Sequence, residues 1–423
     1  MAPLEPWEKA IVDAEKFLQT EHGKLTCIEC HNGVNVSVKE EAHAGLIPSP
    51  SEQPDVYCAE CHEEQVAAYP NALHNSMAGY WTTINIRNGN VLEDHPALNE
   101  MFNNHCASCH TSCGECHVSQ PKNVGGGLFS GHVFEKTPPM TRSCTACHGS
   151  RVGNEYLGKN EGFPGDVHFR EARMNCVKCH TGEALHGDPS NAPDHRLSGA
   201  EDPKCTDCHA DAASGADGIE MHAYHGDGAT LSCQVCHSIS YTSCDGCHVA
   251  ISEKTGNPFF ETQATYMTFF IGKNPIQSED RPYRYVPVRH VPIAPTSYQF
   301  YGENLLTNFD ALPTWVYATP HNIQRNTPQN ASCEACHGNP DIFLTADKVH
   351  ESELSANLKV IVQALPAPLD LIFAAMPQPD GHADLASTAC VACHADGIRN
   401  APVFPENHVE FHNDSCSGCH KLP

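Results

Sequence analysis

The chain contains twelve copies of the pattern Cys-x-x-Cys-His, and these copies use every one of its 24 cysteines. Two thiols three residues apart can add to the two vinyl groups of a porphyrin, and the imidazole that follows at once can bind its iron. The pattern therefore predicts twelve sites of covalent c-type haem. The predicted sites are Cys27/Cys30/His31, Cys58/Cys61/His62, Cys106/Cys109/His110, Cys113/Cys116/His117, Cys144/Cys147/His148, Cys176/Cys179/His180, Cys205/Cys208/His209, Cys233/Cys236/His237, Cys244/Cys247/His248, Cys333/Cys336/His337, Cys390/Cys393/His394 and Cys416/Cys419/His420.

Zinc sites and disulfides are the other common uses of many cysteines. A zinc site needs two Cys-x-x-Cys arms, or one arm and a separate pair of histidines, and nothing in it requires a histidine after every second cysteine. A disulfide framework would not repeat one fixed cysteine spacing twelve times. The repeated pattern thus favours haem over both alternatives.

Histidine is abundant enough to supply a second ligand to every iron, because 12 of the 29 histidines lie in the motifs and 17 remain. Five of these stand eight residues before the first cysteine of a motif, which suggests a reused local geometry, although each could serve a neighbouring haem: His105, His168, His225, His382 and His408. Eight more are predicted ligands at other spacings: His43, His74, His132, His186, His195, His222, His290 and His321. A solvated or hydrogen-bonded imidazole explains four others as well as ligation does: His22, His95, His350 and His412.

The elements that position these residues should be short. Each predicted haem has about 35 residues of chain, too few to build a conventional protein core around it. The chain also has 30 Gly and 31 Pro, and only 7% of its residues are aromatic. We therefore expect a mostly irregular, loop-rich fold with short helices and a few short strands, wrapped around a chain of haems that supply much of the buried apolar surface.

The motifs divide the chain unevenly. Nine precede residue 249 and three follow residue 332, so we expect a nine-haem region over 1–248, a haem-free β-rich insert over 249–332 and a three-haem region over 333–423. Residues 265–271 and 283–291 are rich in β-formers and predict strands in the insert. A strand or short helix is expected over 358–365. The closely spaced motifs that start at Cys106 and at Cys233 predict two tight di-haem units.

The formal net charge of −26 makes nucleic acid an improbable partner. It suits attraction of basic redox proteins, and it serves solubility equally well. Covalent haem attachment takes place outside the cytoplasmic membrane, so an export signal is expected. Residues 1–20 lack a basic segment followed by an apolar one, and no run of 18 apolar residues occurs. We expect an extracellular or periplasmic protein with no transmembrane segment.

The chain resembles the bacterial multihaem c-type cytochromes of extracellular and periplasmic respiration, here with twelve haems. The resemblance rests on the motifs and on two longer strings, residues 58–64 followed by His74, and residues 144–149 followed by Asp166-Val167-His168. It implies an electron carrier, not an enzyme, that passes electrons over a long range through mostly bis-histidine haems.

Several assemblies and activities remain compatible with this resemblance. Motifs near both ends, at Cys27 and Cys416, favour a polymerising filament in which the chain is its own partner. A monomeric periplasmic or porin-inserted conduit is the alternative. A multihaem reductase with one open haem is a further one, although such relatives often carry Lys in place of the motif histidine, and this sequence has no Cys-x-x-Cys-Lys.

Overall fold

The computed structural model describes residues 5, 7–89, 95–109, 111–121, 124–198, 202–225, 229–241 and 243–367, without the side chains of residues 108, 220, 243–246 and 262–267. These residues fall into two compact units built from interleaved segments. Unit 1 draws on Met1–Pro203, Cys244–Tyr266 and Val291–Leu312, and unit 2 on Lys204–Ser243, Met267–His290 and Pro313–Pro423. The division by motif content into 1–248, 249–332 and 333–423 stays a prediction.

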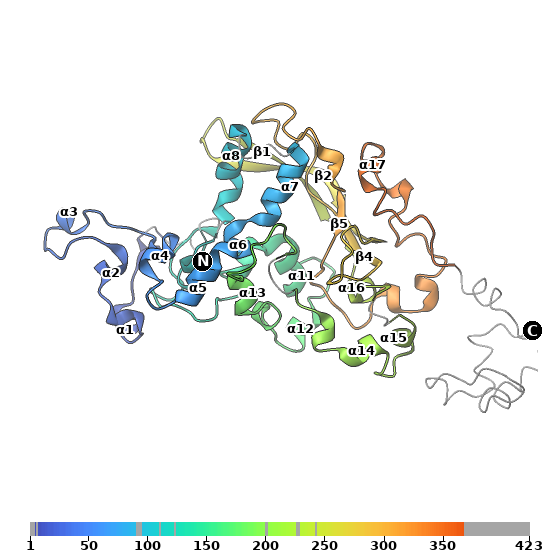
Figure 1. Ribbon diagram of the computed structural model, residues 1–423, viewed down its shortest axis with the longest axis horizontal. Coiled ribbons are helices and arrows are strands. Elements are labelled where there is room, and N and C mark those ends of the chain that lie inside the picture. The colour runs from blue at the N-terminus through green and yellow to red at the C-terminus, as the bar shows by residue number, and fades with distance from the viewer. Residues whose placement is uncertain are drawn as a thin grey trace, which may run out of the picture. The chain divides into compact units, whose positions relative to one another are not determined.

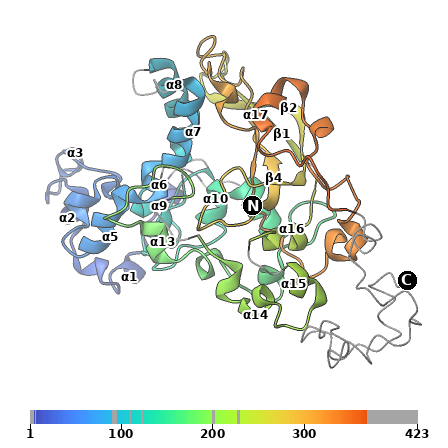
Figure 2. The same ribbon diagram turned by 45° about the vertical axis from the view of Figure 1, so that its right-hand side comes forward.

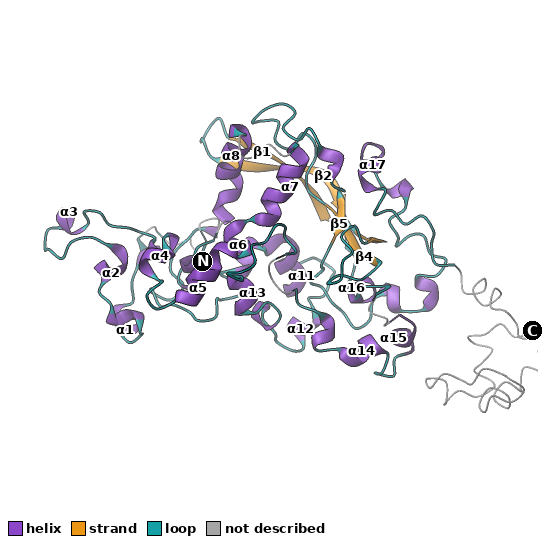
Figure 3. Ribbon diagram, viewed as in Figure 1, coloured by secondary structure: helices purple, strands orange, loops and turns teal. Residues whose placement is uncertain are grey.

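The described part of the chain is rich in loops joined to short helices (Figure 3). Its α-helices are α1 (Ala14–Phe17), α2 (Cys27–His31), α3 (Lys39–Ala42), α4 (Pro54–Tyr57), α5 (Glu63–Ala68), α6 (Leu73–Ser76), α7 (Ala78–Asn88), α8 (Pro96–Met101), α9 (Cys113–His117), α10 (Cys144–Cys147), α11 (Asn154–Leu157), α12 (Val167–Arg170), α13 (Gly182–His186), α14 (Ala210–Ser214), α15 (Glu220–His225), α16 (Cys233–His237) and α17 (Leu354–Asn357). All but α7 have six residues or fewer. Helices this short cannot persist alone and need tertiary contacts or a cofactor to hold them.

Glycine ends several of these helices. The longest, α7, stops at Gly89, whose φ of +90° lies in the left-handed region and whose N–H bonds back to the last turn. Gly158 ends α11 in the same way, with a φ of +69°. The many glycines of the sequence thus limit helix length, as its composition predicts.

In the described part of the chain, five strands form two sheets: β1 (Ser243–Ile251), β2 (Pro258–Met267), β3 (Phe269–Lys273), β4 (Tyr285–His290) and β5 (Trp315–Tyr317). Strands β1 and β2 pair with each other, and β3, β4 and β5 form a second sheet in that order. Phe269 faces Arg289 in the first register, and His290 faces Trp315 in the second. The predicted loop-rich fold with short helices and a few short strands is confirmed.

The strand or short helix predicted for 358–365 is wrong. This segment is irregular, and it lies along the edge of β3. The Lys273 N–H donates to the Val360 carbonyl at 2.8 Å, and the Val362 N–H donates to Leu344 at 2.8 Å. Its apolar residues are buried because they join the core of the sheet and not because they form a regular element.

Each unit has a small protein core. In unit 1, α7 and α8 lie side by side (Figures 1 and 2), where Ile84 packs with Leu98, Met101 and Val249 of β1. In unit 2, the inner face of the three-stranded sheet packs in one cluster: Val286, Val288, Trp315, Tyr317, Leu344, Val349, Val360 and Ile361.

Long stretches around the motifs contribute no buried residue to these cores. No described residue from 7 to 65 is buried, and none is from 167 to 231. The first stretch nevertheless exposes large apolar side chains, including Trp7, Leu18 and Val56, each 66–68% accessible. Protein packing alone does not explain how such segments hold a shape, because isolated short helices are unstable.

Candidate haem-attachment sites

Most of the described motifs form one turn of helix. In the segment from Cys58, the His62 N–H donates to the Cys58 carbonyl at 2.9 Å, and the motifs at Cys144, Cys176, Cys205 and Cys333 repeat this bond at the same distance. Positions i, i+3 and i+4 lie on one face of a helical turn. The turn therefore presents two thiols and one imidazole to the same side, as a porphyrin attached at two vinyl groups and ligated at its iron requires.

Local sequence starts some of these turns. Thr26 caps α2 and Ser112 caps α9, each in a capping box with a glutamate three residues later, Glu29 and Glu115. The first x of each of these two motifs is Ile28 or Gly114, and the second x is the capping glutamate. The variable positions of the motif thus help to form the turn that orients its cysteines and histidine.

The motif that starts at Cys244 departs from this geometry. Cys247 and His248 lie in strand β1, where both are partly exposed, and the Cys247 N–H donates to the Pro292 carbonyl at 3.2 Å. Successive side chains of a strand point to opposite faces. The strand therefore directs the Cys247 thiol and the His248 imidazole to different sides, whereas a helical turn would bring them together. Haem attachment at this motif, and the second tight di-haem unit, stay predictions that this strand does not support.

Six motif histidines lie opposite a histidine from outside the motifs in the described part of the chain. Their ring centroids are 5.8–6.2 Å apart, and their planes meet at angles from 16° to 85°. The pairs, with the motif histidine second, are His22 with His62, His132 with His31, His74 with His148, His186 with His117, His222 with His237, and His225 with His337. The first four pairs lie in unit 1 and the last two in unit 2.

This distance fits two imidazoles on opposite sides of one metal ion. A metal–imidazole bond is about 2 Å long and the ring centre lies roughly 1.2 Å beyond the nitrogen, which places the two centroids about 6.4 Å apart. Ordinary aromatic contacts also cover about 4.5–7 Å, so the distance does not decide by itself. The partners are the more informative feature, because each of the six pairs joins one motif histidine to one histidine from outside the motifs.

Two further motif histidines, His180 and His209, end helical turns near other imidazoles. Their N–H groups donate to the Cys176 and Cys205 carbonyls. His180 is partly exposed, and His209 is exposed at the start of α14. Burial lowers the pKa of His74 with a smaller contribution from His180, and burial lowers that of His237 with a smaller contribution from His209. Both motif rings thus lie close to one of the pairs, and their own second ligands stay predictions.

In four motif histidines, the Nδ1 nitrogen of the ring already forms a hydrogen bond. The Nδ1–H groups of His31 and His117 donate to backbone carbonyls at 2.7 Å, and those of His237 and His337 do so at 3.0 Å. A proton held on Nδ1 leaves the lone pair on Nε2, which is the arrangement of a metal-binding histidine with its supporting hydrogen bond.

Burial keeps several of these imidazoles neutral. It lowers the pKa of His74 to about 4, with the nearby His148 adding to the effect. Burial also lowers the pKa values of His22, His132 and His186 below the ordinary range. Desolvation disfavours the imidazolium form, and only the neutral ring can bind a metal.

His132 has two further features that suit ligation. Its φ of +79° lies in the left-handed region, which is uncommon for a residue with a side chain. Its Nδ1 atom is buried without a hydrogen-bond partner. Backbone strain and an unpaired buried nitrogen both cost free energy, and a ligand bond at this ring would offset them.

None of the described thiols belongs to a fully buried residue, although cysteine is among the residues most often buried. The 19 cysteines whose side chains are described are exposed or partly exposed, and none of them forms a disulfide with another. Cys109, which ends a 3-10 helix (Ala107–Cys109), is exposed, as are Cys179 and Cys208. Thiols that are at least partly accessible can react with a porphyrin that is attached covalently.

The structure does not pair every predicted ligand with a motif histidine. His105 lies in a π-helix (Phe102–Cys106), where its Nε2 is 2.8 Å from the hydroxyl of Tyr301. His290 Nε2 donates to Glu353 at 2.9 Å. His195 accepts the Leu197 N–H at Nδ1, at 3.1 Å. Each of the three rings thus contacts a group other than a motif histidine. Haem ligation by these histidines stays a prediction.

Three other predicted ligands have described positions. His43 is exposed at the end of α3. His321 donates from Nδ1 to the Thr319 carbonyl at 2.8 Å, and His168 donates from Nδ1 to Asp166 at 2.9 Å. The remaining predicted site residues lie outside the described positions or side chains: His110, Cys244, His382, Cys390, Cys393, His394, His408, Cys416, Cys419 and His420.

The sequence did not predict His22 as a ligand, because a solvated or hydrogen-bonded imidazole explained this histidine as well as ligation did. It stands five residues before Cys27 and so lacks the eight-residue offset. The eight-residue offset also fails to predict which motif histidine lies opposite a given histidine. His225 precedes Cys233 by eight residues but lies opposite His337, whereas His222 lies opposite His237 of the Cys233 motif. No spacing rule distinguishes these cases, because chain folding brings the partners together.

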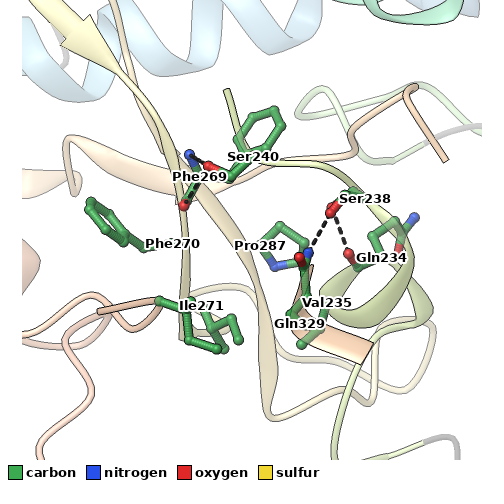
Figure 4. Close-up of a pocket in the computed structure, with 10 residues that line it drawn as sticks. Gln234, Val235, Ser238, Ser240, Phe269, Phe270, Ile271, Pro287 and Gln329 are labelled. Carbon is green, nitrogen blue, oxygen red and sulfur yellow. Dashed lines mark hydrogen bonds between the residues drawn. The ribbon is translucent and has the colours of Figure 1, made fainter. Parts of the chain in front are cut away.

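The hollows beside two of these sites differ in size. A cavity of about 50 Å³ lies against α16 and is lined by Val235, Ser238, Phe269 and Gln329, among others (Figure 4). It has room for about one or two water molecules. A larger hollow of about 360 Å³ is lined by Leu73 and Met77, which flank His74, and by Arg196. A guanidinium there is suited to bind a carboxylate, such as a haem propionate.

Comparisons with known proteins found no matching family model, curated protein or solved structure. Among the described residues, no helix is long and apolar enough to cross a membrane. No group of three or more His, Cys, Asp or Glu side chains in that part of the chain is arranged to hold a metal ion unaided. Each pair of imidazoles could supply two ligands to one iron, and a porphyrin would supply the other four.

Proposed function

We propose that this chain is an electron carrier that holds twelve covalent c-type haems, most of them ligated by histidine on both faces. The proposal depends on the six pairs in which one motif histidine lies opposite one histidine from outside the motifs. Neither zinc nor disulfide chemistry requires an imidazole about 6 Å from each motif histidine, whereas bis-histidine haem does.

The chain's own residues would have three tasks at each site. The two thiols anchor the porphyrin, the paired imidazoles fix the iron between them, and the carbonyls bonded to Nδ1 orient the motif rings. Haem iron, when bound, alternates between ferric and ferrous states and so relays one electron at a time. Ligation on both faces leaves no position for a substrate, which favours a carrier over a reductase.

Neighbouring attachment sites are directly connected, as electron hopping requires. In unit 1, the Ser112 cap of α9 lies 3.0 Å from Ser51, whose 3-10 helix (Pro50–Glu52) precedes the Cys58 motif. The Ser143 hydroxyl, just before α10, donates to the Glu115 carbonyl of α9 at 3.4 Å. In unit 2, Cys236 and Cys336 pack against one apolar cluster. Porphyrins held at these sites would lie close together.

Two measurements on the purified protein test the proposal. The haem-to-protein ratio should be twelve, and electron paramagnetic resonance should show low-spin ferric iron throughout. A ratio near eleven or lower in fully matured protein would contradict the haem count, and the strand-bound motif at Cys247 and His248 would be the first site to examine. A substantial high-spin signal, or stoichiometric binding of cyanide or carbon monoxide, would instead favour the reductase with an open haem.

The proposal includes a location outside the cytoplasmic membrane, where covalent haem is attached, and assembly into filaments for extracellular respiration. Electron microscopy of the purified protein distinguishes filaments from single particles. Single particles at all protein concentrations would favour a periplasmic or porin-inserted conduit.

A further inference from the structure

One free histidine of unit 2 is held by a carboxylate and not by a carbonyl. His222 donates from Nδ1 to Asp217 Oδ2 at 2.6 Å, while the histidine opposite it, His237, donates from Nδ1 to the Gln324 carbonyl at 3.0 Å. A hydrogen bond to a charged acceptor is shorter and roughly twice as strong as one between neutral groups. The two imidazoles of this pair therefore have unequal supporting bonds.

Asp217 is fixed in place by a second bond. Its Oδ1 accepts the Ile219 N–H at 3.1 Å, so one carboxylate both caps the approach to α15 and holds the ring of His222. The two side chains are only 21% and 24% exposed. Asp217 as a whole residue is nevertheless exposed, so solvent reaches its carboxylate, and the bond from the Ile219 N–H helps to hold that carboxylate beside the imidazole.

Such a bond changes what the imidazole offers a metal. A carboxylate that draws the Nδ1 proton toward itself gives the ring partial imidazolate character and makes Nε2 a stronger donor. A stronger donor stabilises the ferric state more than the ferrous state, because the ferric iron carries the larger positive charge. The backbone carbonyl that holds His237 has a much weaker effect, since it bears no net charge.

We propose that Asp217 is a positioning residue that lowers the reduction potential of the haem held between His222 and His237. This inference rests on the proposed function, because it requires a haem at the Cys233 motif. It goes beyond that function by assigning one of the twelve haems a potential set by a particular side chain. Unit 1 has a comparable bond, from His168 Nδ1 to the buried Asp166 at 2.9 Å.

The test compares variants of the full-length, haem-loaded protein. In Asp217→Asn, the amide cannot draw the Nδ1 proton as a carboxylate does, so about one-twelfth of the haem absorbance should reduce at a higher potential in a spectroelectrochemical titration. Asp217→Glu keeps the charge and should stay close to the wild type. Asp211→Asn is the matched control, because Asp211 is an exposed acid on α14, the helix that packs against α15.

Electron paramagnetic resonance distinguishes a change in donor strength at His222 from a general effect of removing one negative charge. The low-spin g values of one haem should shift in Asp217→Asn and not in Asp211→Asn, because only the first change alters donation from an axial ligand. An equal shift of potential in both variants would overturn the inference, since distant charge would then explain it. No change in Asp217→Asn would overturn it as well.

Haem counting distinguishes this inference from the function on which it rests. Wild-type protein without haem would refute the function, whereas twelve haems with an unchanged potential in Asp217→Asn would refute only the role of Asp217. If Asp217→Asn matured with fewer haems, Asp217→Ser would replace it, because serine can still accept the Ile219 N–H but offers His222 no carboxylate. The same upward shift is expected there, and its absence would contradict the inference.

Discussion

At the scale of single residues, what matters is the state and direction of each imidazole. Several motif histidines have their Nδ1 atoms engaged by carbonyls, and burial lowers the pKa values of several free partners. Both effects favour a neutral ring with a free Nε2. Other histidines have neither feature and no motif histidine opposite them. The exposed His350 is an example, and its Nδ1 lies 2.7 Å from the Ser352 hydroxyl.

This contrast predicts different outcomes for two alanine variants in unit 2. His225→Ala should convert about one haem in twelve from low-spin to high-spin and raise its reduction potential. The reason is that an iron held between His225 and His337 would lose one of its two histidine ligands. His350→Ala should leave the spectrum unchanged. Spin quantitation by electron paramagnetic resonance measures both. Identical spectra in the two variants would mean that the His225–His337 pair does not hold an iron.

At the scale of elements, α15 is the clearest example of a short helix with two tasks. Its six residues present His222 to His237 and His225 to His337, three positions apart on one helical face. Helices α14, α15 and α16 lie close to one another in both ribbon views (Figures 1 and 2), and α14 packs against α15. One helix thus couples two attachment sites rigidly.

Breaking this helix should therefore affect two haems at once. In Ala223→Pro, the ring removes the N–H that donates to the Ile219 carbonyl at 3.2 Å and clashes with the preceding turn. About two haems in twelve should become high-spin, against one in His222→Ala. Glu220→Pro is the control, since proline is tolerated at the first position of a helix. If Ala223→Pro altered no more haems than Glu220→Pro, α15 would not couple the two sites.

At the scale of the whole molecule, protein core and attachment sites are distributed differently. The three-stranded sheet has a packed apolar cluster of its own, whereas the described residues from 7 to 65 include no buried one. Because apolar burial is the main source of folding free energy, we expect the second kind of segment to need a porphyrin as its core under the proposed function.

Removing one haem should accordingly unfold one kind of segment and spare the other. In Cys27→Ala/Cys30→Ala, amide hydrogen exchange over residues 7–65 should rise about tenfold or more, because local opening no longer has to expose a bound porphyrin to water. Exchange in β3, β4 and β5 should not change. In the control, Cys333→Ala/Cys336→Ala, the neighbouring core that contains Val235 and Phe343 should limit the rise. Equal loosening in both variants would show that the protein core does not protect its own surroundings.

The sequence by itself predicted haem chemistry for the motifs, which stays a proposal, and it determined the loop-rich character of the fold. Wherever the motif forms a helical turn, a spacing of i, i+3 and i+4 puts its residues on one face, so the relation of Cys58, Cys61 and His62 could be assigned without a structure. Abundant Gly and Pro predicted short elements, and β-formers at 265–271 and 283–291 predicted strands, which the structure has at β2, β3 and β4.

Only the tertiary structure decided where the motif forms a turn and which histidine lies opposite which. Cys247 and His248 joined strand β1, because pairing with β2 competes with a local turn. His22 had no offset to reveal it, and His225 lies opposite the motif at Cys333 and not the nearer one at Cys233. Local spacing constrains residues within a turn or two, because backbone hydrogen bonds fix their relative positions. His22 and His62 are 40 residues apart, and His225 and His337 are 112 apart. Such partners meet only through the path of the whole chain, which no local pattern encodes.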